Sequence, residues 1–183
     1  MIVDVMPGGH RRIDRVLDPG FVADIDRLDL AELRSRREQA EDEEADISYL
    51  RRLLQGRLDI LRAELVRRSQ SGDRDVASLL EGLPAILTDD EPVTAFGAVP
   101  RRLVPTRADQ HRRRVEVLVS DETIASLPEL DAADLAGIVE RLGSEEATVS
   151  ARRRAVQRVV DALRSELARR YRDGSAQVSE LLE

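Results

Sequence analysis

The stretch DLAELRSRREQAEDEEADISYLRRLLQGRLDILRAELVRR, residues 29–68, carries a regular apolar pattern. Apolar side chains recur at every seventh position, with further leucines beside this line: Leu33, Ala40, Ile47, Leu54 and Leu61, flanked by Leu50, Leu58 and Leu65. A seven-residue apolar period is typical of the seam of a coiled coil. Asp29 can cap the first turn, and Glu32 can complete a capping box. The stretch therefore predicts one long helix that begins near Asp29 and ends near Arg68.

The same stretch recurs 102 residues later. The pattern ExxxSxxRxxxQxxxD, called the stripe below, occurs at Glu44, Ser48, Arg51, Gln55 and Asp59, and again at Glu146, Ser150, Arg153, Gln157 and Asp161. Five fixed positions recur by chance roughly once in 10^5 registers. The flanking residues repeat at the same displacement, which indicates that a unit of about 45 residues was duplicated. The second copy predicts a second long helix, which is capped by Asp131, ends near Gly174 and has its own seam: Leu135, Leu142, Val149, Val156 and Leu163.

These patterns predict an all-α protein in which two long helices form an antiparallel coiled coil. The expected divisions are an irregular N-terminal arm (1–27), the first helix (28–72), a partly helical linker (73–129), the second helix (130–174) and a tail (175–183). Four prolines exclude a continuous helix in the linker: Pro84, Pro92, Pro100 and Pro105. Short helical pieces remain open at 76–81, 106–118 and 120–127, of which 106–118 could also be extended.

The composition supports an elongated helical protein. The 183 residues include two Phe, two Tyr and no Trp, so few bulky side chains can fill a globular core, and 36% of the residues are charged. The net charge of -7 argues against nonspecific binding to DNA or RNA. There is no Cys, no apolar leader segment and no run long enough to cross a membrane, so we expect a cytoplasmic protein without a membrane partner.

The five stripe residues of each copy share an arc of about 80° on a helix, roughly 100° from the seam. The stripe is therefore expected to lie beside the coiled-coil contact and to be free to meet another molecule. A carboxylate can accept both donors of the guanine Watson–Crick edge, and Arg can donate to its O6 and N7. Two copies on antiparallel helices would suit a two-fold symmetric guanine nucleotide.

Both stripe copies resemble, without departure, the RsiG family of cyclic-di-GMP-responsive anti-sigma factors, which restrain the flagellar-type sigma factor WhiG in sporulating actinobacteria. The resemblance implies that the ten stripe residues contact a dimer of cyclic di-GMP, lying between the anti-sigma factor and the sigma factor. It covers the two helices strongly and the arm and linker weakly. It also implies that the protein represses transcription from genes that need the sigma factor.

Two other classes of function remain. A structural coiled coil would bind no nucleotide, and its stripes would be solvated helix faces with pairs such as Glu44 with Ser48. An enzyme acting on cyclic di-GMP is the weakest class, because hydrolysis needs a metal cluster, and His10 and His111 have no partners at metal-ligand spacing. We therefore expect neither catalysis nor a metal. The basic run at 112–114 is expected to be solvated or to face a protein partner.

Overall fold

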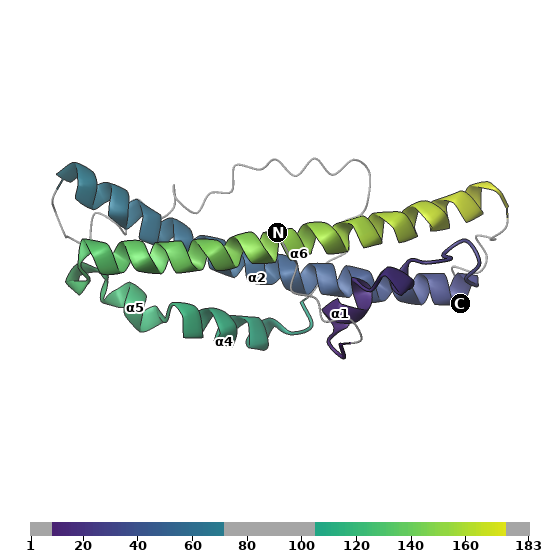
Figure 1. Cartoon of the computed structure of the whole chain (residues 1–183), viewed down its shortest axis with the longest axis horizontal. Helices are drawn as coiled ribbons and strands as arrows, with labels where there is room; N and C mark the ends of the chain where they lie inside the picture. The colour runs from purple at the N-terminus through teal and green to yellow at the C-terminus, as the bar shows by residue number, and fades with distance from the viewer. Residues whose placement is uncertain (1–8, 72–104, 175–183) are drawn as a thin grey trace. The chain divides into compact units, whose positions relative to one another are not determined.

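The long helices begin where their aspartate caps predict. The computed structural model describes residues 9–71 and 105–174, and within them α2 spans Leu30–Ser71 and α6 spans Ala132–Arg172 (Figure 1). Asp29 Oδ1 accepts a hydrogen bond from the Glu32 amide, and Asp131 Oδ1 accepts one from the Asp134 amide, each at 2.7 Å. Glu32 does not complete the capping box, because its carboxylate accepts a hydrogen bond from Arg36 at 2.7 Å.

Helix α6 ends as predicted beside a glycine. Gly174 has a φ of +72°, in the left-handed region that a residue without a β-carbon adopts at low cost. Helix α2 runs to Ser71, a little beyond the predicted end near Arg68. The other described elements are α1 (Arg12–Val16), η1 (Pro19–Phe21), α4 (Ala108–Leu118), α5 (Asp121–Ala125) and η2 (Leu127–Glu129), so the described part of the chain contains helices and no strand.

The described residues divide into two units, and each long helix contributes to both. The first unit holds 9–48, 105–106 and 150–174, and the second holds 49–71 and 107–149. In the first unit, Arg34 donates to Tyr171 Oη at 2.7 Å, and Arg164 pairs with Glu41 at 3.1 Å. Residue numbers rise along α2 as they fall along α6, so the helices pack antiparallel there, which confirms the predicted fold.

The seam forms the core of both units. All ten predicted seam residues are buried: Leu33, Ala40, Ile47, Leu54, Leu61, Leu135, Leu142, Val149, Val156 and Leu163. Of the flanking leucines, Leu50 and Leu58 are buried and Leu65 is half-buried. Burying a leucine or valine side chain contributes about 1.5–3 kcal/mol, so this row of side chains is the main force that holds α2 against α6.

The arm and the end of the linker add short helices to the units. In the first unit, α1 buries Ile13 and Val16, and in the second unit α4 buries Val115, while Val119 is buried directly after it. The segment that could be helical or extended, 106–118, is therefore helical from Ala108. The helix predicted at 76–81 lies outside the described part of the chain.

The duplication reaches further than the sequence analysis found. Segment 12–17, RIDRVL, and segment 114–119, RVEVLV, are also 102 residues apart. Arg12 pairs with Glu43, and Arg114 pairs with Glu145, so equivalent arginines meet equivalent glutamates in the two units. The copied unit is thus a short helix followed by a long one, and the arm belongs to it.

Candidate functional site

The first unit brings one half of each stripe copy together, in what is called here the first cluster (Glu44, Ser48, Arg153 and Gln157). Glu44 Oε1 accepts hydrogen bonds from Arg153 Nε at 3.1 Å and from Gln157 Nε2 at 3.4 Å. Ser48 Oγ donates to Glu44 at 2.7 Å and accepts from Arg153 Nε at 2.9 Å. The Glu44 and Arg153 side chains are 17% and 31% exposed, so the cluster is partly open to solvent.

The second unit contains the second cluster (Arg51, Gln55 and Glu146). Glu146 Oε1 accepts a hydrogen bond from Gln55 Nε2 at 3.3 Å and lies 3.5 Å from Arg51 Nε. The side chains of Arg51 and Glu146 are 26% and 20% exposed. Both clusters therefore follow one rule, in which the glutamate of one stripe copy meets the arginine and glutamine of the other copy.

The clusters modify the prediction that the stripes lie free beside the seam. Their polar residues face each other across the α2–α6 pair, and they already satisfy part of each other's hydrogen-bonding capacity. The hydrogen bond between Ser48 and Glu44, which was expected for a structural coiled coil with solvated stripes, is also present. The three remaining stripe residues differ in exposure, since Ser150 and Asp59 are half-buried and Asp161 is exposed.

A second duplicated polar network, which the sequence analysis did not identify, lies at the C-terminal ends of the long helices. In the first unit, Arg170 donates to the carbonyls of Ile25, Asp26 and Leu28 and to Glu166. Hydrogen bonds from Arg169 and Arg170 lower the pKa of Glu166 to about 2.

The equivalent residues form the same network in the second unit. Arg68 donates to the carbonyls of Leu127 and Leu130, and Glu64 accepts from Arg67 and Arg68. Burial raises the pKa of Glu64, but the hydrogen bonds from the two arginines outweigh it and leave that pKa below the usual value. The repetition of Glu64, Arg67 and Arg68 102 residues later was the signal in the sequence.

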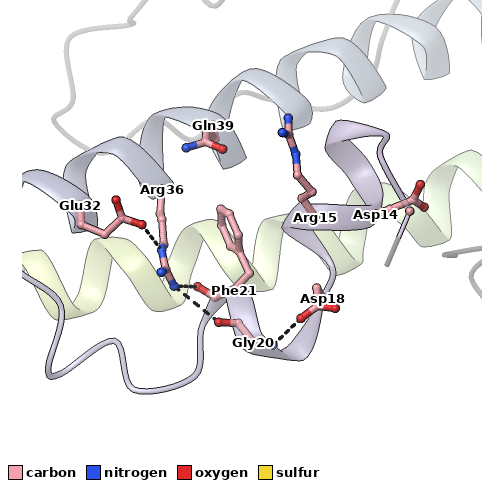
Figure 2. Close-up of a pocket in the computed structure, with 9 residues that line it drawn as sticks. Asp14, Arg15, Asp18, Gly20, Phe21, Glu32, Arg36 and Gln39 are labelled. Carbon is pink, nitrogen blue, oxygen red and sulfur yellow. Dashed lines mark hydrogen bonds and ion pairs between the residues drawn. The ribbon is translucent and has the colours of Figure 1, made fainter. Parts of the chain in front are cut away.

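A pocket of about 370 Å³ lies between the arm and α2 in the first unit (Figure 2). Arg36 crosses it, with Nη1 donating to the Phe21 carbonyl at 2.8 Å and the guanidinium 5.6 Å from the centre of the Phe21 ring. Asp18 accepts a hydrogen bond from the Gly20 amide at 2.8 Å. No stripe residue lines this pocket, and its bonded groups hold the arm on α2.

None of the helices in residues 9–71 and 105–174 combines the length and the apolar character needed to cross a bilayer.

Comparison with known proteins gives one family. The sequence matches the model of the RsiG-like family over residues 19–87 and 121–183, which together are more than half of the chain. The two matched segments begin 102 residues apart, so each begins at the same position of its copy. No curated protein matches the chain. The chain belongs to the RsiG-like family, which is regulatory rather than catalytic and whose membership suggests an anti-sigma role.

Proposed function

We propose that this protein is a cyclic-di-GMP-dependent anti-sigma factor. It binds a flagellar-type, WhiG-like sigma factor in a ternary complex with two molecules of cyclic di-GMP, and it thereby represses the genes that this sigma factor transcribes. The main support is the repeated cluster, in which the same residue types meet in the same exchange in both units. Membership of the RsiG-like family supports the anti-sigma part of the proposal.

The residue types of the clusters fit the chemistry of a guanine nucleotide. Glutamate and aspartate can accept hydrogen bonds from guanine N1 and N2, while arginine can donate to O6 and N7. The existing pairs of Glu44 with Arg153 and of Glu146 with Arg51 are partly exposed, so a ligand can reach them. Hydrogen bonds from a nucleotide to these charged groups would replace charge-assisted hydrogen bonds of the same kind, so the exchange of partners leaves no charge unpaired.

Asp161 is well placed to take part in this exchange. Its side chain is exposed, and it has no hydrogen-bond partner among the described residues. It lies one helical turn beyond Gln157 on α6, on the same side as the first cluster. A guanine that displaces the Glu44–Arg153 pair can therefore meet a further carboxylate within one turn.

In this proposal, the nucleotide strengthens the binding of the anti-sigma factor to the sigma factor. If cyclic di-GMP binds the complex of anti-sigma and sigma factor more tightly than either protein alone, linkage strengthens that complex by the same factor. A hundredfold preference corresponds to about 2.7 kcal/mol. The sigma factor is then kept from RNA polymerase only while the nucleotide concentration is high.

A calorimetric titration of cyclic di-GMP into this chain mixed with a flagellar-type sigma factor tests the proposal. We expect two nucleotides per complex, and we expect the double variant Asp59→Ala, Asp161→Ala to weaken binding about tenfold or more, because guanine donors lose their acceptors. Glu140→Ala is the matched control, since Glu140 is exposed on α6 outside the stripe. Unchanged affinity in the double variant would show that these aspartates are not part of the nucleotide site. Absence of heat with the native protein would refute the proposal that cyclic di-GMP is its ligand.

A structural coiled coil without a nucleotide ligand is the second candidate. The observation that favours it is the pairing of the stripe residues with each other, which resembles the polar pairs that flank many coiled-coil seams. On this alternative, Glu44→Ala and Glu146→Ala lower the free energy of unfolding and cyclic di-GMP leaves the melting temperature of the native protein unchanged. A rise of the melting temperature with nucleotide concentration excludes it.

A further inference from the structure

The stripe continues one turn beyond its last aspartate in both copies. Arg62 follows Glu44 by 18 positions, and Arg164 follows Glu146 by 18 positions. Eighteen residues make five full turns at 3.6 residues per turn, so each arginine lies directly in line with the glutamate that begins its stripe. The two arginines therefore extend the same face of α2 and of α6.

These equivalent arginines meet different surroundings. In the first unit, both Nε and Nη2 of Arg164 lie 3.1 Å from Glu41 Oε1, and Glu41 is buried. The residue equivalent to Glu41 in the second copy is Gly143. In the second unit, Arg62 Nη2 lies 3.9 Å from the position that a β-carbon at Gly143 would occupy. Arg62 thus reaches the same place on the facing helix and meets no carboxylate there.

Arg62 consequently keeps its donors available. It is exposed, and no acceptor among residues 9–71 and 105–174 takes a hydrogen bond from it. Gly143 lies three residues before Glu146, so Arg62 reaches α6 within one turn of the second cluster. The planar guanidinium fork is the side chain best suited to hold a phosphate through two parallel hydrogen bonds.

The second cluster brings no net positive charge to meet a phosphate. The charges of Arg51 and Glu146 offset each other, and Asp59, the last residue of the same stripe copy as Arg51, adds a negative charge. A nucleotide with charged phosphates would be repelled by that sum, although the guanine base would be accepted. Arg62 restores the balance in the second unit. In the first unit Arg164 is instead engaged with Glu41, whose Oε1 also lies 3.6 Å from Arg37 Nε.

We propose that Arg62 is a further ligand-binding residue of the second cluster, which donates its guanidinium to a phosphate of the nucleotide. The equivalent Arg164 serves instead as a structural partner of Glu41. This inference rests on the proposed function, and it assigns different roles in nucleotide binding to the two units. The second unit holds a phosphate as well as a base, whereas the first unit holds the base.

The substitution Gly143→Glu tests the inference, because it recreates in the second unit the ion pair that holds Arg164 in the first. A side chain fits at Gly143, since the nearest atom to its β-carbon would be the flexible Arg62 Nη2 at 3.9 Å. Replacing a glycine inside α6 also favours the helix, so we expect a higher melting temperature. Nucleotide affinity should fall about tenfold at the same time, as in Arg62→Ala, because one charge-assisted hydrogen-bond donor is withdrawn.

Calorimetry with cyclic di-GMP and the complex of this chain with the sigma factor provides the measurement. Gly143→Gln is the uncharged control and Arg164→Ala is the repeat-matched control, and both are expected to stay within about twofold of the native affinity. Native affinity in Gly143→Glu and Arg62→Ala, with weakened binding in Asp59→Ala, would overturn the inference and leave the proposed function standing. Absence of nucleotide binding by the native protein would overturn both.

A carboxylate of the sigma factor is the competing partner for Arg62, and it gives a different result. Sigma binding measured without nucleotide would then fall in Arg62→Ala and Gly143→Glu, and this outcome would also overturn the inference. On our proposal, that nucleotide-free binding is unchanged in both variants. The dependence of nucleotide affinity on salt should become shallower in Arg62→Ala, because one cation–phosphate contact is lost.

Discussion

Removal of the Arg12 side chain should destabilise the first unit far more than removal of its repeat equivalent destabilises the second. Arg12 donates to Glu43 and to Asp46, whose side chains are 4% and 0% exposed. Arg114 pairs with Glu145, whose side chain is 24% exposed, and Arg114 itself is 44% exposed. Deleting the cation from a buried pair costs about 3–5 kcal/mol, whereas an exposed pair contributes about 0–1 kcal/mol.

The expected loss for Arg12→Ala is at the lower end of that range, about 3 kcal/mol, because Glu43 and Asp46 keep other interactions and Arg12 is itself 17% exposed. Urea unfolding followed by the helical circular dichroism signal provides the assay. With a slope of about 1–3 kcal/mol/M, the midpoint should fall by about 1–3 M in Arg12→Ala and by at most about a third of that shift in Arg114→Ala. Equal midpoints in the two variants would refute the reasoning from burial.

Three further predictions concern the helices. Glu166→Gln should flatten the acid dependence of stability: because Arg169 and Arg170 lower the pKa of Glu166 from 4.5 to about 2, the native protein has this contribution in full above about pH 4.5 and loses it as the pH falls to about 2, which an acid titration of the unfolding free energy would show. Leu54→Ala should cost about 2–5 kcal/mol in urea unfolding, since Leu54 is 0% exposed in the seam. Asp131→Ala should cost about 1 kcal/mol in the same assay, because the Asp134 amide loses its cap.

The seam and the helix caps could be predicted because both depend on residues that are close in the sequence. A seven-residue apolar period fixes which face of a helix is buried, and all ten predicted seam residues are buried. An aspartate before the first turn has its target only a few residues away, and Asp29 and Asp131 bond as predicted.

Which stripe residues meet across the α2–α6 pair could not be predicted from the sequence, for a physical reason. A helical projection places side chains around one axis, but it does not give the height at which a second helix passes. The contact of Glu44 with Arg153 and Gln157 depends on that height. Once the packing of the antiparallel helices is known, the exchange of glutamate with arginine and glutamine follows from the repeat.

The similarity between the arm segment 12–17 and segment 114–119 was missed because the two segments share kinds of residue, apolar or acidic, more than identical residues. RIDRVL and RVEVLV share their first arginine, and Ile13 and Val115 are different residues with the same buried position. Asp14 and Glu116 likewise keep only the charge. A search for identical residues therefore stops at the long helices, although the apolar and acidic positions continue in step.

Each stripe copy supplies the glutamate of one cluster and the arginine and glutamine of the other. An inherited point change in one copy can therefore alter a single cluster, as the divergence of Glu41 and Gly143 has altered the surroundings of one arginine in each unit. Loss of a whole copy would remove both clusters together. Point mutations can thus change the two clusters independently during evolution. Duplication of the copy, or its loss, creates or removes both clusters together.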